Sequence, residues 1–255
     1  MRIPWESLLA LVATLISLLW VKRWITEHVQ ELSMRWVGDP DVALILYFVL
    51  LLPGVVIHEL SHLLVALLLR VRVRSFSLGP VRRARGKRVS LGSIEVAKVD
   101  PVRGSLIGAA PLLAGSAVIL LIGNRVLGIA EWAAAFQSLS VGGILAGVGQ
   151  ITGVPDFWMW LYLIFAVSNS MLPSDSDMQF VRPVLVFLGF TLLVVLVVGG
   201  FPAIPDGASQ LVSRGVGYLA SAFGLALAVD LLFVLALGLL LWITRRAQDR
   251  QEIAN

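Results

Sequence analysis

One apolar run of the chain, Leu51–Leu69, reads LLPGVVIHELSHLLVALLL and is long enough to lie within a membrane. It contains His58, Glu59 and His62, although the whole chain has only three histidines. An ionisable side chain at membrane depth costs from about 2.5 kcal/mol upward, so such residues are rare and are retained for a function or a buried partner. The run therefore requires a fold that encloses a polar site within apolar helices.

These polar residues have the spacing found in zinc-dependent hydrolases. Residues four apart share one helix face with Cβ atoms about 6 Å apart, so His58 and His62 can bind one metal ion. Glu59 lies about 100° further round the helix, where its carboxylate can serve as the general base. A catalytic zinc ion takes three protein ligands, so one ligand is missing from the pattern. The alternative is a polar patch whose histidines are hydrogen-bonded to neighbouring helices.

The composition indicates an integral membrane protein. Of the 255 residues, 58% are hydrophobic and 14% are charged, whereas soluble domains carry about 25% charged residues. The chain has no cysteine, which excludes disulfide bonds and thiolate zinc ligands. The net charge of +4 does not indicate a nucleic-acid partner, because the basic residues cluster where a membrane protein places them.

The apolar runs predict an all-α polytopic membrane protein with about six transmembrane helices, forming one integral membrane domain over residues 1–255. The predicted spans are Leu8–Val21, Val42–Leu69, Leu106–Ile122, Phe157–Val167, Val184–Val198 and Gly217–Ile243. Residues 22–41 are predicted to be a polar connection, with Gly38-Asp39-Pro40 as a helix breaker and His28 facing solvent. Residues 124–155 are mixed and rich in glycine, and they fit either an amphipathic or a re-entrant segment.

A small β-strand element is predicted after the second span. Residues 71–78 alternate between apolar and polar side chains, and residues 88–96 are similar. Gly79-Pro80 and Gly86 lie between them, which is typical of short strands joined by turns. Residues 70–103 also hold ten of the twenty lysines and arginines. We therefore predict a basic, strand-bearing cytoplasmic loop at the inner leaflet.

The distribution of basic residues predicts an orientation. The C-terminal tail is the second most basic segment, and an even number of predicted spans separates it from the basic loop, so both can be cytoplasmic. Lys22, Arg23 and Arg35 then fall outside. The second and fourth spans both run inward, which brings His58 and His62 to the same depth as the loop that contains Asp177. We expect a multi-pass protein of a prokaryotic cell membrane, with its active site toward the cytoplasmic side.

Three further polar residues are candidates for the site. Asp177 and Asp175 follow the fourth span, and either could be the third metal ligand. Asn169, at the end of that span, could hydrogen-bond a substrate carbonyl or the developing oxyanion, or simply cap the helix. Asp230 lies deep in the sixth span, where a buried partner such as an arginine or a backbone group is favoured over a zinc role.

Together these residues resemble the site-2 protease family of intramembrane zinc metalloproteases. The match consists of H-E-L-S-H within a span, a strand-bearing loop, and then Asn169, Pro173 and Asp177, and it covers about residues 42–180. That family has a second motif, roughly N-x-x-P-x-x-x-x-D-G, whose Asp is the third zinc ligand. Counting eight residues from Asn169 reaches Asp177, so the resemblance favours Asp177 over Asp175.

The resemblance implies an intramembrane zinc metalloprotease. Zn2+ would be held by His58, His62 and Asp177, with Glu59 as the general base and Asn169 as an additional catalytic residue. The substrate would be a transmembrane protein in the lipid bilayer, held in extended form along the predicted strands. Regulated release of a membrane-tethered factor is the function that the resemblance implies, and the oligomeric state is undetermined.

Two other functions remain open at the level of sequence. Pro173 is one position later than in the family's second motif, Met178 replaces its Gly, and residues 110–114 lack the Asn of a further small-residue motif. A non-catalytic membrane scaffold that retains a metal site would tolerate these changes. A metal transporter could use the same cluster, but it needs a polar path across several spans, and only Asp230 suggests one.

Overall fold

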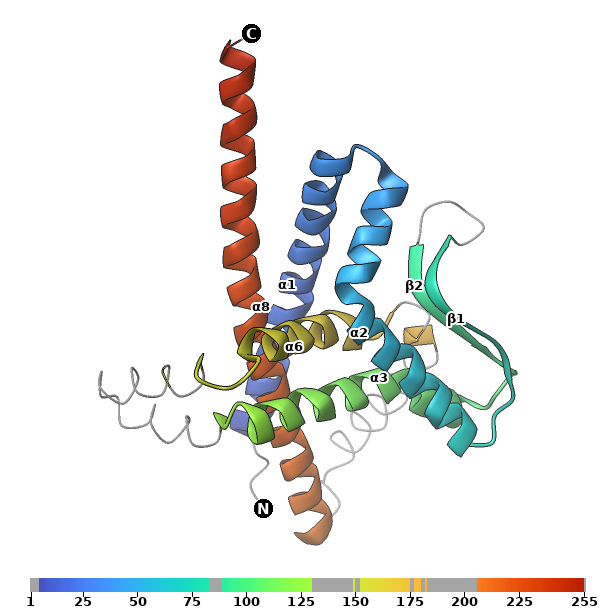
Figure 1. Ribbon diagram of the computed structural model, residues 1–255. Helices are drawn as coiled ribbons and strands as arrows, with labels where there is room; N and C mark the ends of the chain where they lie inside the picture. Colours follow the sequence, from blue (N-terminus) through green and yellow to red (C-terminus); the bar gives the residue numbers. More distant parts are fainter. Residues whose placement is uncertain are drawn as a thin grey trace, which may run out of the picture.

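The computed structural model describes residues 5–82, 89–129, 149, 152–174, 177–179, 182 and 206–254. In chain order its elements are α1 (Trp5–Val37), α2 (Pro40–Leu68), β1 (Val73–Arg82), β2 (Val89–Val96), α3 (Pro101–Leu121), the π-helix η1 (Ile122–Val126), α6 (Phe157–Met171) and α8 (Asp206–Ala254). Figure 1 shows α1, α2 and α8 side by side, with α3 and α6 running across them. The strands lie outside the helices, next to α2.

Four of the described helical segments are long and apolar enough to cross a membrane. They are Leu8–Val37, Pro40–Leu68, Pro101–Val126 and Gln210–Arg246. A helical membrane protein is thus confirmed, but the prediction of about six spans is not. The predicted fourth span corresponds to α6, which has only 15 residues. The predicted fifth span, residues 184–198, lies outside the described residues, as does most of the segment 124–155.

The first helix differs from the prediction. Residues 22–37, which we expected to be a polar connection, continue α1 and pack against α8. The breaker is confirmed, because Gly38 adopts a φ of +72° and the Asp39 carboxylate accepts the first N–H groups of α2. His28 is partly exposed and stacks on Trp24 with ring centroids 3.9 Å apart.

The C-terminal ends of α1 and α8 are joined by an ion pair. The Arg245 guanidinium donates to the Glu31 carboxylate at 2.8 and 3.1 Å, and Arg35 lies 2.9 Å from the same carboxylate. The two long helices therefore run in the same direction. The prediction that Arg35 and the C-terminal tail lie on opposite sides is wrong, because α1 continues as one helix beyond Val21 and brings Arg35 beside Arg245.

The predicted β element is confirmed as a two-stranded antiparallel sheet. Its register pairs Phe76 with Ile94 and Leu78 with Gly92, with irregularities near the start and middle of β1. The residues that connect the strands, 83–88, are outside the described part of the chain. The sheet contacts α2 along β1 and β2, which places it beside the helix that carries H-E-L-S-H.

Close helix contacts hold α2, α3 and α6 together. A Cβ atom at Gly54 of α2 would collide with the carbonyl of Ala166 in α6, and one at Gly115 of α3 would lie 2.5 Å from Met171. Without side chains at these points, the backbones approach closely, as in other membrane helix pairs. Pro53 lies inside α2, and Figure 1 shows the helix bending along its length. This packing sets the position of His58, one turn after Gly54.

Candidate metal centre

Two histidines on one face of α2 have their ring orientation set by backbone carbonyls. The Nδ1 atom of His58 lies 2.7 Å from the Ser170 carbonyl oxygen, and that of His62 lies 2.7 Å from the Ile107 carbonyl oxygen. A carbonyl oxygen can only accept, so each Nδ1 carries the hydrogen. Each Nε2 atom is then left as a lone-pair donor, the state that a metal-binding imidazole needs.

A proline and the end of a helix explain why these carbonyls are available. Pro111 in α3 has no N–H group, so it cannot bond the carbonyl of Ile107 one turn earlier. The helix α6 ends at Met171 and Pro173 follows, which leaves the Ser170 carbonyl without a helical donor. Local breaks in two helices thus supply the acceptors that orient the histidines on a third helix.

Asp177 completes the group from beyond the end of α6. Its Oδ1 atom lies 3.2 Å from the His62 Nε2 atom, and its Oδ2 atom lies 3.6 Å from the His58 Nε2 atom. The backbone N–H and the hydroxyl of Ser174 both donate to Oδ2, at 2.7 and 2.6 Å. The structure thus brings Asp177 to the histidines, as the sequence predicted. Asp175, the second candidate, lies outside the described residues.

The electrostatics of Asp177 suit a ligand. Burial alone raises the pKa of the Asp177 carboxyl, but when the imidazoles of His58 and His62 are protonated, they and Ser174 outweigh burial and hold that pKa well below its usual range. The side chain is only 13% exposed. The carboxyl is therefore ionised at neutral pH, which metal coordination requires.

The donor set fits a metal ion. The two Nε2 atoms lie 3.2 Å apart, and one ligand atom from each of His58, His62 and Asp177 lies within 4.8 Å of the others. A tetrahedral ion with bonds of about 2.0–2.2 Å sets its ligand atoms about 3.3 Å apart. Two lone pairs and a carboxylate that face one another form a group that could hold a cation. Within the described part of the chain, this is the one such group of three.

Glu59 is buried beside this group. Its side chain is 5% exposed, and it lies one residue from His58 without joining the three ligands. Strand β2 passes directly over it, because a Cβ atom added at Gly92 would lie 2.5 Å from Glu59 Oε1. Sequence reasoning missed Gly92, although a glycine inside a strand often marks the close approach of another group.

Asn169 and Asp230 belong to a second polar cluster, between α6 and α8. The amide of Asn169 donates to the Phe165 carbonyl at 2.9 Å and to Asp230 Oδ1 at 3.1 Å, and the Ser168 hydroxyl donates to the same Oδ1 at 2.7 Å. The partners of Asp230 are thus side chains, not the arginine or backbone group that we expected. Both amide hydrogens of Asn169 are committed here, so its proposed contact with an oxyanion stays a prediction.

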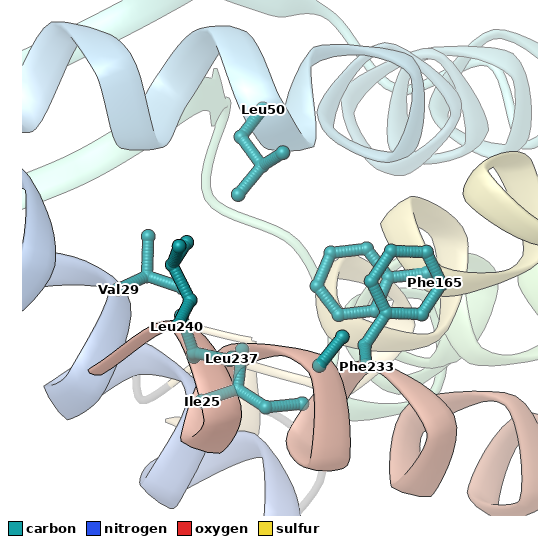
Figure 2. A pocket seen from close by; sticks show the side chains of 8 residues that line it. Ile25, Val29, Leu50, Phe165, Phe233, Leu237 and Leu240 are labelled. Atoms are coloured by element: carbon teal, nitrogen blue, oxygen red, sulfur yellow. The ribbon is translucent and has the colours of Figure 1, made fainter. Parts of the chain in front are cut away.

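A separate apolar cavity of about 170 Å³ lies between α1, α2, α6 and α8. Figure 2 shows its lining, including Phe165 and Phe233, whose rings stack with centroids 4.0 Å apart. The lining residues are Ile25, Val29, Leu50, Phe165, Phe233, Ala236, Leu237 and Leu240. Because all of them are apolar, the cavity adds no ligand or proton-transfer group to the metal centre.

Comparison of the chain with family models, with curated proteins and with solved structures finds no match. The assignment therefore depends on the geometry of the chain itself. Its fold and site define a helical membrane protein with a two-stranded sheet and a His-His-Asp group that could hold a metal ion.

Proposed function

We propose that this protein is an intramembrane zinc metalloprotease that hydrolyses peptide bonds of membrane-embedded substrates. The observation that carries the proposal is the convergence of two Nε2 atoms and the Asp177 carboxylate beside a buried Glu59, among apolar helices. A structural metal site does not need this additional carboxylate. A hydrolytic site does, because a base must receive the proton of the attacking water.

Zinc is the ion that the ligands favour. His58 and His62 offer imidazole nitrogen and Asp177 offers carboxylate oxygen, a set that suits zinc, whereas magnesium and calcium prefer oxygen ligands alone. When bound, zinc supplies Lewis-acid polarisation and lowers the pKa of water toward about 7. Three protein ligands leave one coordination position for that water.

Glu59 performs the proton transfers in this proposal. As the water oxygen bonds to the substrate carbonyl carbon, the Glu59 carboxylate takes the water proton. As the C–N bond breaks, Glu59 passes that proton to the leaving amine, so the site returns to its starting state. The burial of Glu59 beneath β2 keeps bulk water away from this exchange.

The sheet provides a means to present the substrate. A transmembrane helix hides its carbonyl groups in its own hydrogen bonds, so the substrate must be locally extended before water can attack. An extended segment that adds to the sheet makes main-chain hydrogen bonds, and β2 passes next to Glu59 at Gly92. A transmembrane segment of another protein is therefore the substrate class that we propose.

The decisive experiment replaces Glu59 by Gln. The purified protein is reconstituted in liposomes with a panel of single-span transmembrane peptides, and products are identified by mass spectrometry. Cleavage should fall about 100- to 10,000-fold, because the general base is lost. Zinc content should remain at about one ion per chain, because the three ligands are intact.

Glu27→Gln is the matched control, since it makes the same chemical change at an exposed position of α1, away from the sheet. It should cleave at the parental rate. Undiminished cleavage by Glu59→Gln would reject the assigned base. A parent chain that binds zinc but cleaves no peptide in the panel would favour the scaffold instead.

A further inference from the structure

The apolar cavity between α1, α2, α6 and α8 has a buried floor and an exposed side. Ile25 and Phe165 are buried at its floor, whereas Ala236 and Leu240 of α8 are exposed. Figure 2 shows Leu50 of α2 across the cavity from the side chains of α8. Because α1, α2 and α8 all contain candidate membrane spans, the exposed side faces the hydrocarbon of the bilayer. The cavity therefore opens to lipid tails.

The size and lining of the cavity decide what can fill it. Its volume is about 170 Å³ and its lining is apolar, so it offers water no hydrogen-bond partner. Apolar cavities of about 150 Å³ stay dry and take up apolar molecules. The walls of an empty cavity lose dispersion contacts that an occupant restores. A partner helix is about 10–12 Å wide and does not fit, whereas a single acyl chain does. The occupant that suits this cavity is thus one acyl chain of a lipid.

One end of the cavity leads to a basic group. Along α8 the lining runs from Phe233 to Leu240, and Arg245 follows about 7.5 Å further along the helix axis. The Arg245 guanidinium pairs with the Glu31 carboxylate of α1, and Arg35 pairs with the same carboxylate. Two guanidinium groups against one carboxylate leave an excess of positive charge, and the Arg245 side chain is 53% exposed. An anionic headgroup can therefore reach Arg245.

The same ends of α1 and α8 lie at the membrane boundary. Their candidate spans end at Val37 and Arg246. Trp36 and Trp242, close to these ends, are both exposed. The Arg246 guanidinium lies 4.9 Å from the centroid of the Trp242 ring. Exposed tryptophan beside arginine at the end of a span is typical of the level of the lipid headgroups. The basic group thus lies at the depth of the phosphates, and the cavity lies at the depth of the acyl chains.

We propose that the cavity binds one anionic phospholipid, with an acyl chain between the four helices and the headgroup phosphate on Arg245. Arginine suits a phosphate because its planar guanidinium presents several N–H donors at once. The bound lipid contacts α1, α2, α6 and α8 together and therefore stabilises their packing. The cavity shares no residue with the candidate metal centre. This inference is thus independent of the proposed function.

The test uses the full chain, delipidated in a neutral detergent, and native mass spectrometry to count bound lipids. Anionic phosphatidylglycerol and zwitterionic phosphatidylcholine with the same acyl chains are offered in equal amounts. The parent should retain one phosphatidylglycerol per chain in preference to phosphatidylcholine. Its thermal midpoint should rise as phosphatidylglycerol is added, because a ligand of the folded state stabilises that state. Equal retention of the two lipids would overturn the proposal.

Ala236→Phe tests the cavity, because the new ring competes with the acyl chain for the same space. Bound phosphatidylglycerol should fall about tenfold or more, since the chain loses its contacts with the cavity walls. Ala228→Phe is the matched control, because it makes the same change at an exposed position of α8 that does not line the cavity. If Ala236→Phe does not fold, Leu50→Phe fills the cavity from the opposite wall. Equal lipid binding by the cavity variant and Ala228→Phe would overturn the proposal.

Arg245→Gln tests the headgroup contact, because it leaves Glu31 balanced by Arg35 alone. The preference for phosphatidylglycerol over phosphatidylcholine should fall about fivefold, the ratio that one arginine near an anionic headgroup contributes. Arg214→Gln is the matched control, because Arg214 is exposed near the opposite end of α8 and should leave the preference unchanged. An equal fall in both variants, or no fall in Arg245→Gln, would overturn the proposal.

Discussion

Two buried polar clusters in the same bundle differ in how their hydrogen bonds are completed. The candidate metal centre consists of His58, His62 and Asp177, and the α6–α8 cluster consists of Ser168, Asn169 and Asp230. In the α6–α8 cluster, the Asp230 carboxylate accepts hydrogen bonds from the side chains of Ser168 and Asn169. In the candidate metal centre, two nitrogen lone pairs and a carboxylate face one another, because the N–H groups of both histidines already donate to backbone carbonyls.

This difference shows which cluster could hold a metal ion. Polar groups buried in an apolar bundle are costly unless they are paired, so an arrangement with only acceptors in its middle is stable when a cation fills it. The α6–α8 cluster pairs its carboxylate with its own side chains. Removing a residue from the metal centre should therefore abolish ion binding, whereas removing one from the α6–α8 cluster should affect stability. Three substitutions test this contrast.

The largest effect is expected from His62→Ala. Loss of a residue that only orients a ligand weakens zinc binding roughly 10- to 100-fold. His62→Ala removes one of the three ligands themselves, so zinc affinity should fall by more than that. Zinc content is measured by elemental analysis of purified protein. His28→Ala is the matched control, because His28 stacks on Trp24 away from the three ligands. Equal zinc content in the two variants would remove the basis for a metal centre.

An intermediate effect is expected from Gly92→Ala. The new methyl group would lie 2.5 Å from Glu59 Oε1, so the carboxylate must move. Misplacing a catalytic group by about 1 Å can cost 100-fold, so cleavage should fall roughly 10- to 100-fold while zinc remains bound. The rate is followed with a cleaved transmembrane peptide. Gly217→Ala in α8, where an added Cβ atom meets nothing within 4 Å, serves as the control and should leave the rate near that of the parent.

The smallest effect is expected from Asp230→Ala. The Ser168 hydroxyl and the Asn169 amide lose a shared acceptor in a buried site. The cost should be about 1–3 kcal/mol of stability, seen as a lower thermal midpoint in detergent. Asp230→Asn keeps an acceptor oxygen and should lose less. Zinc content should be unchanged in both, and a loss of zinc as large as that of His62→Ala would contradict the separation of the two clusters.

Some elements were predictable because their signals are local. The antiparallel strands follow from period-two alternation between glycines, and the structure contains them at Val73–Arg82 and Val89–Val96. The packing of α1 was less predictable. Its second half carries apolar residues at helical spacing (Val21, Ile25, Val29 and Leu32, all buried), but its partner is α8, where Arg245 pairs with Glu31. Such a partner, more than 200 residues away along the chain, gives no local signal.

By itself, the sequence determined that the protein lies in a membrane and that His58, Glu59 and His62 share a helical turn, because hydrophobicity and the i to i+4 spacing are properties of one segment. It also supplied Asp177 as a candidate. Only the tertiary structure decided that Asp177 reaches both imidazoles, that carbonyls freed by Pro111 and by the end of α6 orient the rings, and that Gly92 lies over Glu59. These contacts join segments from different parts of the chain, and their geometry depends on how closely the helices pack.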